Sequence, residues 1–130
     1  MRLLLDTHSL LWMLNDDYGH LRGKTAKQLF LDENNSLFFS LASVWEMAIK
    51  IKLGKLDLKQ PIADFILEQL AINGIQLLDI QLTHILKTME LPFHHRDPFD
   101  RLIIAQSQAE QMILLSADNI FTAYDVELAW

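Results

Sequence analysis

Four acidic residues are the side chains of this sequence whose types and positions suggest chemistry. Asp6 and Asp118 each follow a short apolar run, and Asp100 and Glu46 each stand near the start of a predicted helix. Carboxylates supply the hard oxygen ligands that Mg²⁺ and Mn²⁺ prefer. If the fold gathers these acids in one place, they would form a pocket for one or two such ions.

Each acid also has a purely local explanation. Asp6 and Asp118 suit the N-cap of a following helix, a position where aspartate is favoured. In the sequence DPFD, Asp97 suits the cap, and the proline and Asp100 suit the first helical turn. Glu46 precedes a lysine by four residues, which predicts an exposed ion pair worth about 0.3–0.5 kcal/mol. Taken one at a time, none of the acids requires a function.

Short apolar runs alternate with helical segments along the chain. The runs predict buried strands at residues 3–5, 37–39, 75–80 and 112–115, and the segments between them predict helices at 9–14, 24–31, 41–53, 61–72, 83–90 and 97–110. This alternation is typical of crossover units that build a parallel sheet covered on both faces. We therefore expect an α/β fold.

The helix expected at 41–53 has the clearest apolar periodicity. Its apolar residues recur at spacings of three and four: Leu41, Val44, Trp45, Ala48, Ile49 and Leu53. We expect this face to pack against the core, with Trp45 in the core or on a dimer face and Glu46 well away from it.

The expected sheet explains how the acids could act together. In a parallel sheet the carboxyl ends of the strands meet at one edge, and ligands bind in the crevice beyond it. Asp6 and Asp118 would lie at that edge, with Asp100 and Glu46 on helices that start there. Like charges this close repel one another unless a cation joins them. An acidic pocket holding one or two divalent ions can cleave a phosphodiester with a metal-activated water.

Composition limits the class of protein. The 130 residues are 51% hydrophobic and 22% charged, which indicates a globular chain, and the length suits a single domain over 1–130. The absence of cysteine excludes thiolate nucleophiles, disulfides and cysteine-based zinc sites. A net charge of −6 disfavours passive nucleic-acid binding. No apolar stretch is long enough for a membrane span, and Asp6 interrupts a would-be signal peptide, so we expect a cytoplasmic protein with no membrane partner.

Four segments together resemble the ordered motifs of PIN domains, and more narrowly those of the VapC-type toxins of prokaryotic toxin–antitoxin pairs. They read LLLDTH from Leu3, SLASVWE from Ser40, DPFDRLIIAQ from Asp97 and LLSAD from Leu114. Each motif alone is weak, but their order and spacing together are specific. The resemblance extends from the first residues to about Phe121.

The resemblance implies a metal-dependent endoribonuclease on a three-layer α/β/α sandwich with a central parallel sheet. The catalytic residues that it implies are Asp6, Glu46, Asp100 and Asp118, of which Asp6 and Asp100 are the strongest ligands for Mg²⁺ or Mn²⁺. Thr7 and Ser116 match small hydroxyl positions that could orient a carboxylate or a water. The implied partners are an RNA substrate, a cognate antitoxin protein and a second copy of the chain in a homodimer.

Other residues near the motifs have simpler explanations. Asp97 is expected to cap its helix, and His94 and His95 to lie in a surface loop, with contact to RNA or help in a proton transfer as the alternative. A lysine-rich stretch, made of Lys50, Lys52, Lys55 and Lys59, predicts a solvated face, with contact to an RNA backbone as its alternative.

Two other functions are compatible with the acids. In haloacid-dehalogenase-like phosphatases an aspartate in the position of Asp6 is phosphorylated, but a second aspartate follows two residues later, where this chain has His8. A PIN-fold interaction domain without turnover would keep the fold and bind a partner. Metal-dependent cleavage distinguishes the nuclease from both.

Overall fold

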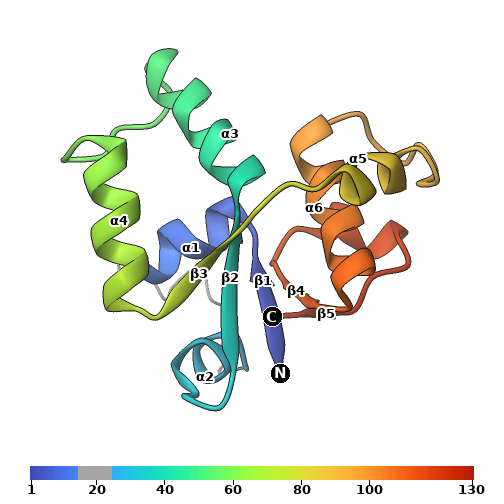
Figure 1. Cartoon of the computed structure of the whole chain (residues 1–130), viewed down its shortest axis with the longest axis horizontal. Helices are drawn as coiled ribbons and strands as arrows, with labels where there is room; N and C mark the ends of the chain where they lie inside the picture. Colours follow the sequence, from blue (N-terminus) through green and yellow to red (C-terminus); the bar gives the residue numbers. More distant parts are fainter. Residues whose placement is uncertain (15–24) are drawn as a thin grey trace.

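The computed structural model of the protein describes residues 1–14 and 25–130 (Figure 1). In chain order its elements are β1 (Arg2–Leu5), α1 (Thr7–Leu14), α2 (Thr25–Leu31), β2 (Ser36–Ser40), α3 (Leu41–Lys52), α4 (Ile62–Ile72), β3 (Ile75–Leu78), α5 (Leu82–Thr88), α6 (Pro98–Glu110), β4 (Ile113–Leu115), the 3-10 helix η1 (Asn119–Ala123) and β5 (Leu128–Ala129). Within these residues, no helix has the length and apolar character needed to cross a membrane.

The strands form one parallel sheet in the order β3-β2-β1-β4-β5. The central strand β1 pairs on both sides, with Leu3 opposite Leu37 of β2 and Ile113 of β4. The chain builds outward from β1 to β3 and then returns to add β4 on the other side of β1. Because all strands run the same way, their carboxyl ends meet at one edge, and the order reverses between β1 and β4.

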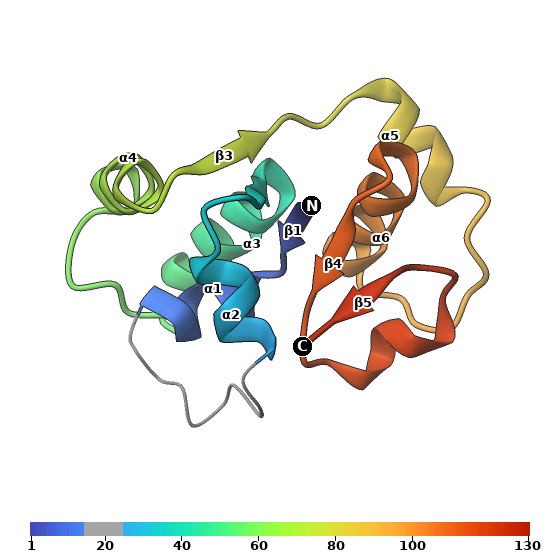
Figure 2. The same ribbon diagram turned by 90° about the horizontal axis from the view of Figure 1, so that it is seen from below.

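Alternate residues of the strands serve two separate cores. Leu3 and Leu5 face a cluster that contains residues of α1, α2, α3 and α4, whereas Leu4 faces a cluster built from α6, η1 and the segment before α6. Figure 2 shows these two groups of helices on opposite sides of the sheet. The predicted α/β/α sandwich with a central parallel sheet is therefore confirmed.

Helix boundaries follow local signals closely. Asp97 caps α6 through its side chain, and Pro98 occupies the first helical position. Ser40 caps α3, and Gly54 and Gly74 adopt left-handed backbone conformations just beyond α3 and α4. These boundaries agree with the predicted ones to within two residues, except that residue 24 of the predicted second helix lies outside the described residues.

Three elements in the second half of the chain differ from the prediction. Strand β3 ends at Leu78 rather than at residue 80, and the sequence pattern did not predict η1 or β5. Strand β5 has only two residues, and it is a strand because Leu128 and Ala129 pair with β4. A pairing partner brought in by the tertiary fold leaves no periodicity in so short a segment.

The predicted core face of α3 is wrong. Trp45 and Leu53 are 61% and 62% exposed, and Ile49 is also exposed. The helix instead buries Ala42, Ser43, Glu46 and Met47. Small residues allow α3 to approach the sheet and α6 closely, and this rotation turns Glu46 inward and the larger apolar side chains outward.

A buried polar network joins α3 to α6 and was not predicted from the sequence. Ser40 Oγ donates to Gln106 Oε1 at 2.5 Å, and Gln106 Nε2 donates to the Asp79 carbonyl at 3.3 Å. His84 lies against the same amide and contacts Glu110 through Nε2 at 2.8 Å. These bonds hold the start of α3 and the middle of α6 beside each other.

The two-sided sheet yields a stability prediction. Leu4 is fully buried, so Leu4→Ala should lower the free energy of unfolding by about 2–5 kcal/mol through lost burial and a cavity. Urea denaturation followed by circular dichroism measures this change. The matched control is Leu67→Ala on α4, where the side chain is 71% exposed. Equal losses in the two variants would contradict the assignment of the second core.

Candidate active site

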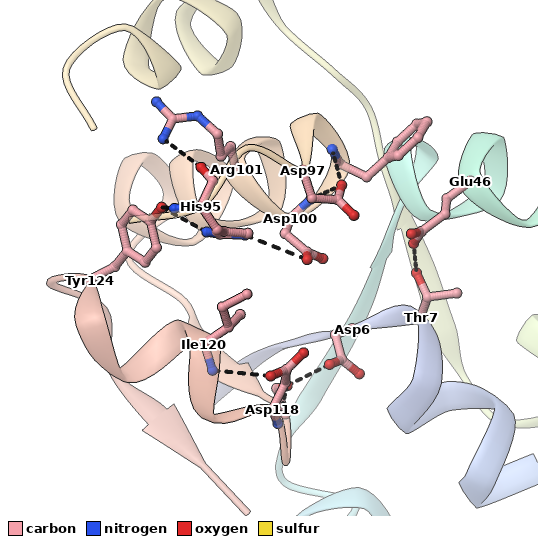
Figure 3. Close-up of polar contacts among 12 residues, drawn as sticks. Asp6, Thr7, Glu46, His95, Asp97, Asp100, Arg101, Asp118, Ile120 and Tyr124 are labelled. Carbon is pink, nitrogen blue, oxygen red and sulfur yellow. Dashed lines mark hydrogen bonds and ion pairs between the residues drawn. The ribbon is translucent and has the colours of Figure 1, made fainter. Parts of the chain in front are cut away.

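The candidate active site is a crevice at the carboxyl-terminal edge of the sheet, between α3 and α6 (Figure 3). Asp6 follows β1 and Asp118 follows β4, on the two strands between which the sheet order reverses. Asp100 is in the first turn of α6, and Glu46 is in the middle of α3. The close-up shows the carboxylates of Asp6, Asp100 and Asp118 pointing toward one another, with Glu46 to one side.

Asp6 lies deepest of these acids. It is 6% exposed, its Oδ1 accepts the Ser9 backbone N–H at 2.7 Å, and its Oδ2 accepts the Ser116 hydroxyl at 2.5 Å. Burial raises the pKa of this carboxyl above its ordinary value, although both hydrogen-bond partners oppose the shift. Each oxygen keeps a second lone pair, so the carboxylate can still accept a proton or contact a cation.

Glu46 is buried and fully engaged. Thr7 Oγ1 donates to Glu46 Oε1 at 2.8 Å, and Lys50 Nζ lies 3.5 Å from Oε2. The predicted ion pair with the lysine is present, but the carboxylate is 8% exposed rather than on the surface. Thr7 therefore does orient a carboxylate, and Glu46 forms the wall of the crevice on the α3 side.

Asp97 and Asp100 share the first turn of α6 and do different things. Asp97 Oδ1 accepts the backbone N–H groups of Phe99 and Asp100 at 2.9 and 3.2 Å, which is the predicted cap. The pKa of the Asp100 carboxyl is raised to about 7, with burial as the largest cause. Repulsion by neighbouring carboxylates adds to this effect, and the contributions decrease in the order Asp97, Glu46, Asp6 and Asp118. Burial and the neighbouring carboxylates thus both act to raise the pKa of Asp100.

Asp118 is the exposed member of the group. Its Oδ1 accepts the Ile120 N–H at 3.0 Å and so caps η1. Ser116 connects it to Asp6, because the Ser116 hydroxyl accepts the Asp118 N–H at 3.1 Å while donating to Asp6. Ser116 thus orients a carboxylate and also fixes the backbone that carries the next one.

The chemistry of these side chains fits a divalent cation. Among residues 1–14 and 25–130, no three His, Cys, Asp or Glu side chains form a ready-made set of metal ligands. Mg²⁺ in proteins commonly keeps several waters and contacts only one or two carboxylates. The opposed carboxylates of Asp6 and Asp100, both held largely away from solvent, suit such an ion, because its charge would relieve their repulsion.

A groove of about 480 Å³ leads away from the acids between α3 and α6. Its lining includes Glu46, Asp97 and Phe99 together with three basic residues, Lys50, Lys55 and Arg96. Two of the four lysines in the predicted basic stretch thus lie beside the acidic crevice. The ring of Trp45 packs edge-on against Phe99 at 5.2 Å and extends the apolar part of this surface.

Two residues that shape the site, Arg101 and Tyr124, were not predicted from the sequence. Arg101 directly follows Asp100 and is 8% exposed. Its guanidinium donates to four backbone carbonyls, those of Thr88, Leu91, Pro92 and His95. Tyr124, just beyond η1, accepts the His95 N–H at 3.1 Å. The sequence shows only that an arginine follows Asp100, and nothing in it indicates burial or the backbone carbonyls to which the side chain donates.

The two neighbouring histidines have different environments. His94 is exposed, as predicted for a surface loop, and packs edge-on against the Tyr124 ring. The His95 side chain is only 10% exposed, and its Nε2 lies 3.5 Å from Asp100 Oδ2. The surface-loop prediction is therefore wrong for His95, which belongs to the wall of the crevice.

Comparison with known proteins identifies the family. The model of the PIN domain family matches residues 3–127 of this chain. The chain belongs to the PIN domain family. PIN domains are generally nucleases, a class of hydrolase. A search of curated protein sequences found no match.

Solved structures of VapBC complexes share the fold. A chain of VapBC2 from Rickettsia felis, bound to a DNA fragment from their promoter, is 18% identical, with a TM-score of 0.69 over 99% of this chain and 98% of that one. A chain of VapBC-1 from nontypeable Haemophilus influenzae is 16% identical, with a TM-score of 0.67 over 99% of this chain and 97% of that one. A chain of a toxin–antitoxin complex from Klebsiella pneumoniae is 14% identical, with a TM-score of 0.61 over 98% of this chain and 96% of that one. At these identities the likeness concerns the fold.

The raised pKa of Asp100 predicts how stability depends on pH without metal. The folded state holds this proton to about pH 7, whereas an unfolded aspartate loses it near 3.8, so the folded state binds more protons between these values. The free energy of unfolding should therefore fall as pH rises through this window. Asp100→Asn should weaken this fall and be more stable than wild type at pH 8 in EDTA.

Urea denaturation at several pH values measures this dependence. Asp57→Asn, in the exposed segment between α3 and α4, is the matched control and should follow the wild-type profile. The prediction fails if Asp100→Asn shows the same pH dependence as wild type.

Proposed function

We propose that this protein is a metal-dependent endoribonuclease and the toxin component of a type II toxin–antitoxin pair, built as one PIN-like domain over residues 1–130. Asp6 and Asp100 are the metal ligands in this proposal, and Glu46 and Asp118 complete the catalytic pocket. The proposal combines the chemistry of the crevice with membership of the PIN domain family.

The observation that carries the proposal is the crowding of carboxylates around Asp100. Burial and the repulsion of four other acids, Asp97, Glu46, Asp6 and Asp118, raise the pKa of Asp100 to about 7. Such crowding opposes ionisation at neutral pH, so a fold that keeps it must compensate in another way. A bound divalent cation offers that compensation and would restore the charged form of Asp100.

Each proposed catalytic residue has a distinct task. Mg²⁺ or Mn²⁺, when bound, would supply Lewis-acid activation of a water and stabilise charge on the phosphodiester. Asp6 and Asp100 would hold the ion from opposite sides of the crevice. Glu46, held by Thr7, fixes the α3 wall, and Asp118 presents its free oxygen at the solvent-exposed entrance.

The groove between α3 and α6 suits the approach of RNA. Lys50, Lys55 and Arg96 line it beside Glu46 and Asp97, so basic side chains stand next to the acidic crevice. Phosphate contacts from lysine and arginine supply most non-specific affinity for nucleic acids. Phe99 and Trp45 add aromatic surface, on which an unpaired base can stack. The net charge of −6 does not prevent this proposed binding, because these basic side chains lie along the groove through which an RNA strand would pass.

Cleavage of RNA by purified protein tests the function directly. Wild type should cut a mixed RNA pool with Mg²⁺ or Mn²⁺ and not with EDTA. Asp6→Asn and Asp100→Asn should each lower the cleavage rate by at least about 100-fold, because each removes a ligand of the ion. The loss of cleavage in the Asp100→Asn preparation also excludes a contaminating ribonuclease, and Asp57→Asn, a substitution of an exposed aspartate outside the site, should cut like wild type.

The alternatives predict different results. Cleavage by Asp100→Asn at the wild-type rate would remove the assignment. No binding of Mn²⁺ by wild type in calorimetry, together with no cleavage of RNA, would favour the interaction domain. Covalent labelling of Asp6 by a phosphate mimic would favour the phosphotransfer reaction.

The proposed partners fit the exposed apolar side chains. Trp45, Ile49 and Leu53 form an outward stripe on α3 beside the groove, and a cognate antitoxin is proposed to cover this surface. A second stripe lies on α5, where exposed residues recur at spacings of three and four: Leu82, Ile85, Leu86 and Met89. Contiguous apolar surfaces of this kind mark sites of protein association.

We propose the α5 stripe as the homodimer interface. Ile85 lies in its middle, so Ile85→Lys should place a charge in the interface and shift the protein from two chains to one. Sedimentation equilibrium measures the mass of the species. Leu67→Lys changes an equally apolar, exposed residue on α4 and should leave the dimer intact. Dissociation by Leu67→Lys alone would move the interface to α4.

A further inference from the structure

The segment before α6 places an imidazole between a phenol and the central carboxylate of the site (Figure 3). His95 Nδ1 lies 2.8 Å from Tyr124 Oη, and His95 Nε2 lies 3.5 Å from Asp100 Oδ2. Nε2 is buried and makes no hydrogen bond within the described residues. It therefore faces the carboxylate as a polar atom still available for bonding.

The partners of Tyr124 determine which ring nitrogen carries the proton. Tyr124 Oη already accepts the His95 backbone N–H at 3.1 Å, and its own hydrogen remains to be donated. Donation to Nδ1 makes that atom the acceptor and leaves the proton of the neutral ring on Nε2. The opposite tautomer would turn the Nε2 lone pair toward the carboxylate, which is unfavourable. The contacts thus favour an N–H that points at Asp100.

The ring is held by contacts that do not involve Asp100. The Tyr124 hydroxyl fixes both the backbone and the ring of His95, and the His95 carbonyl lies 3.5 Å from Arg101 Nη1. Arg101 also donates to the carbonyls of Thr88, Leu91 and Pro92, so it anchors the segment that leads to His95. A donor fixed in this way can orient a neighbouring side chain.

We propose that His95 is a positioning residue that holds the carboxylate of Asp100 toward Asp6 by donating from Nε2 to Oδ2. The inference rests on the proposed metal-dependent nuclease. Asp97, Glu46, Asp6 and Asp118 all repel an ionised Asp100 and favour its rotation away from the crevice. The Nε2–H donor opposes that rotation and leaves Oδ1 free to face the ion. The present separation of 3.5 Å is longer than an ordinary hydrogen bond, so the proposed contact requires Asp100 to turn slightly toward His95.

Two amide substitutions of His95 distinguish the effect of the Nε2–H donor from the effect of the imidazole ring. In His95→Gln the side-chain amide can reach the position of Nε2, whereas in His95→Asn it reaches only that of Nδ1. His95→Asn should weaken Mn²⁺ binding and slow RNA cleavage by about 10- to 100-fold, the usual effect of removing a group that orients a metal ligand. His95→Gln should restore both toward wild type. His94→Asn, which changes the exposed neighbour on the same tyrosine, should resemble wild type.

Calorimetric titration with Mn²⁺ and single-turnover cleavage supply the two readouts, and thermal unfolding checks that each variant is folded. A His95→Asn protein that is folded and behaves like wild type would overturn the inference. Equal losses in His95→Gln and His95→Asn would also overturn it, because the donor would then not be what matters.

The tautomer is measurable without metal or substrate. Long-range ¹H–¹⁵N correlation spectra at alkaline pH should show the His95 proton on Nε2 in wild type and a shift toward Nδ1 in Tyr124→Phe. A proton on Nδ1 in wild type would overturn the inference. If wild type neither binds Mn²⁺ nor cleaves, the proposed function fails, and this spectrum still decides whether His95 donates toward Asp100.

Discussion

Repulsion among carboxylates at one edge of the sheet is the constraint around which the rest of the site is arranged. A parallel sheet sends all its strand ends to the same side, so the acids that follow β1 and β4 meet there. The surrounding groups limit the cost of this arrangement. Ser116 and Ser9 donate to Asp6, Thr7 donates to Glu46, and Lys50 lies against it. Asp100 receives no comparable donor at hydrogen-bond distance, and its pKa is the one raised to about 7.

Acids that cap helices also form part of the site, so the two explanations of these residues do not compete. Asp6, Asp97 and Asp118 each use one oxygen to accept a backbone N–H at the start of a helix. That bond fixes the side chain and the turn that carries it, while the remaining lone pairs stay available. Asp100 benefits indirectly, because the cap made by Asp97 sets the turn in which it stands. The helix caps that explain each of these acids locally also hold the acids in the positions where they lie close together.

The parts of the fold predictable from the sequence are those governed by local interactions. The strands through Leu3–Leu5 and Leu37–Phe39 and the start of α6 at Pro98 follow from apolar runs and a capping motif. Strand β5 and the contacts of Ser40 with Gln106 and of His95 with Tyr124 depend on residues far apart in the chain. The PIN-like motifs indicated the four acids because their order was recognisable. They did not reveal His95, which stands outside the motif, or Arg101, whose partners are backbone carbonyls.

The reversed face of α3 explains why hydrophobic periodicity misled the prediction and what it reports instead. Periodicity shows that one side of a helix avoids water, but it does not say whether the sheet or another chain covers that side. In α3 the inner side consists of Ala42, Ser43, Glu46 and Met47, so two small residues and a carboxylate take positions that a purely apolar face would fill. The apolar stripe of Trp45, Ile49 and Leu53 is left beside the groove. A partner segment that buried this stripe would also cover the groove that Glu46 and Asp97 line, so binding of the partner and blocking of the groove would be a single event.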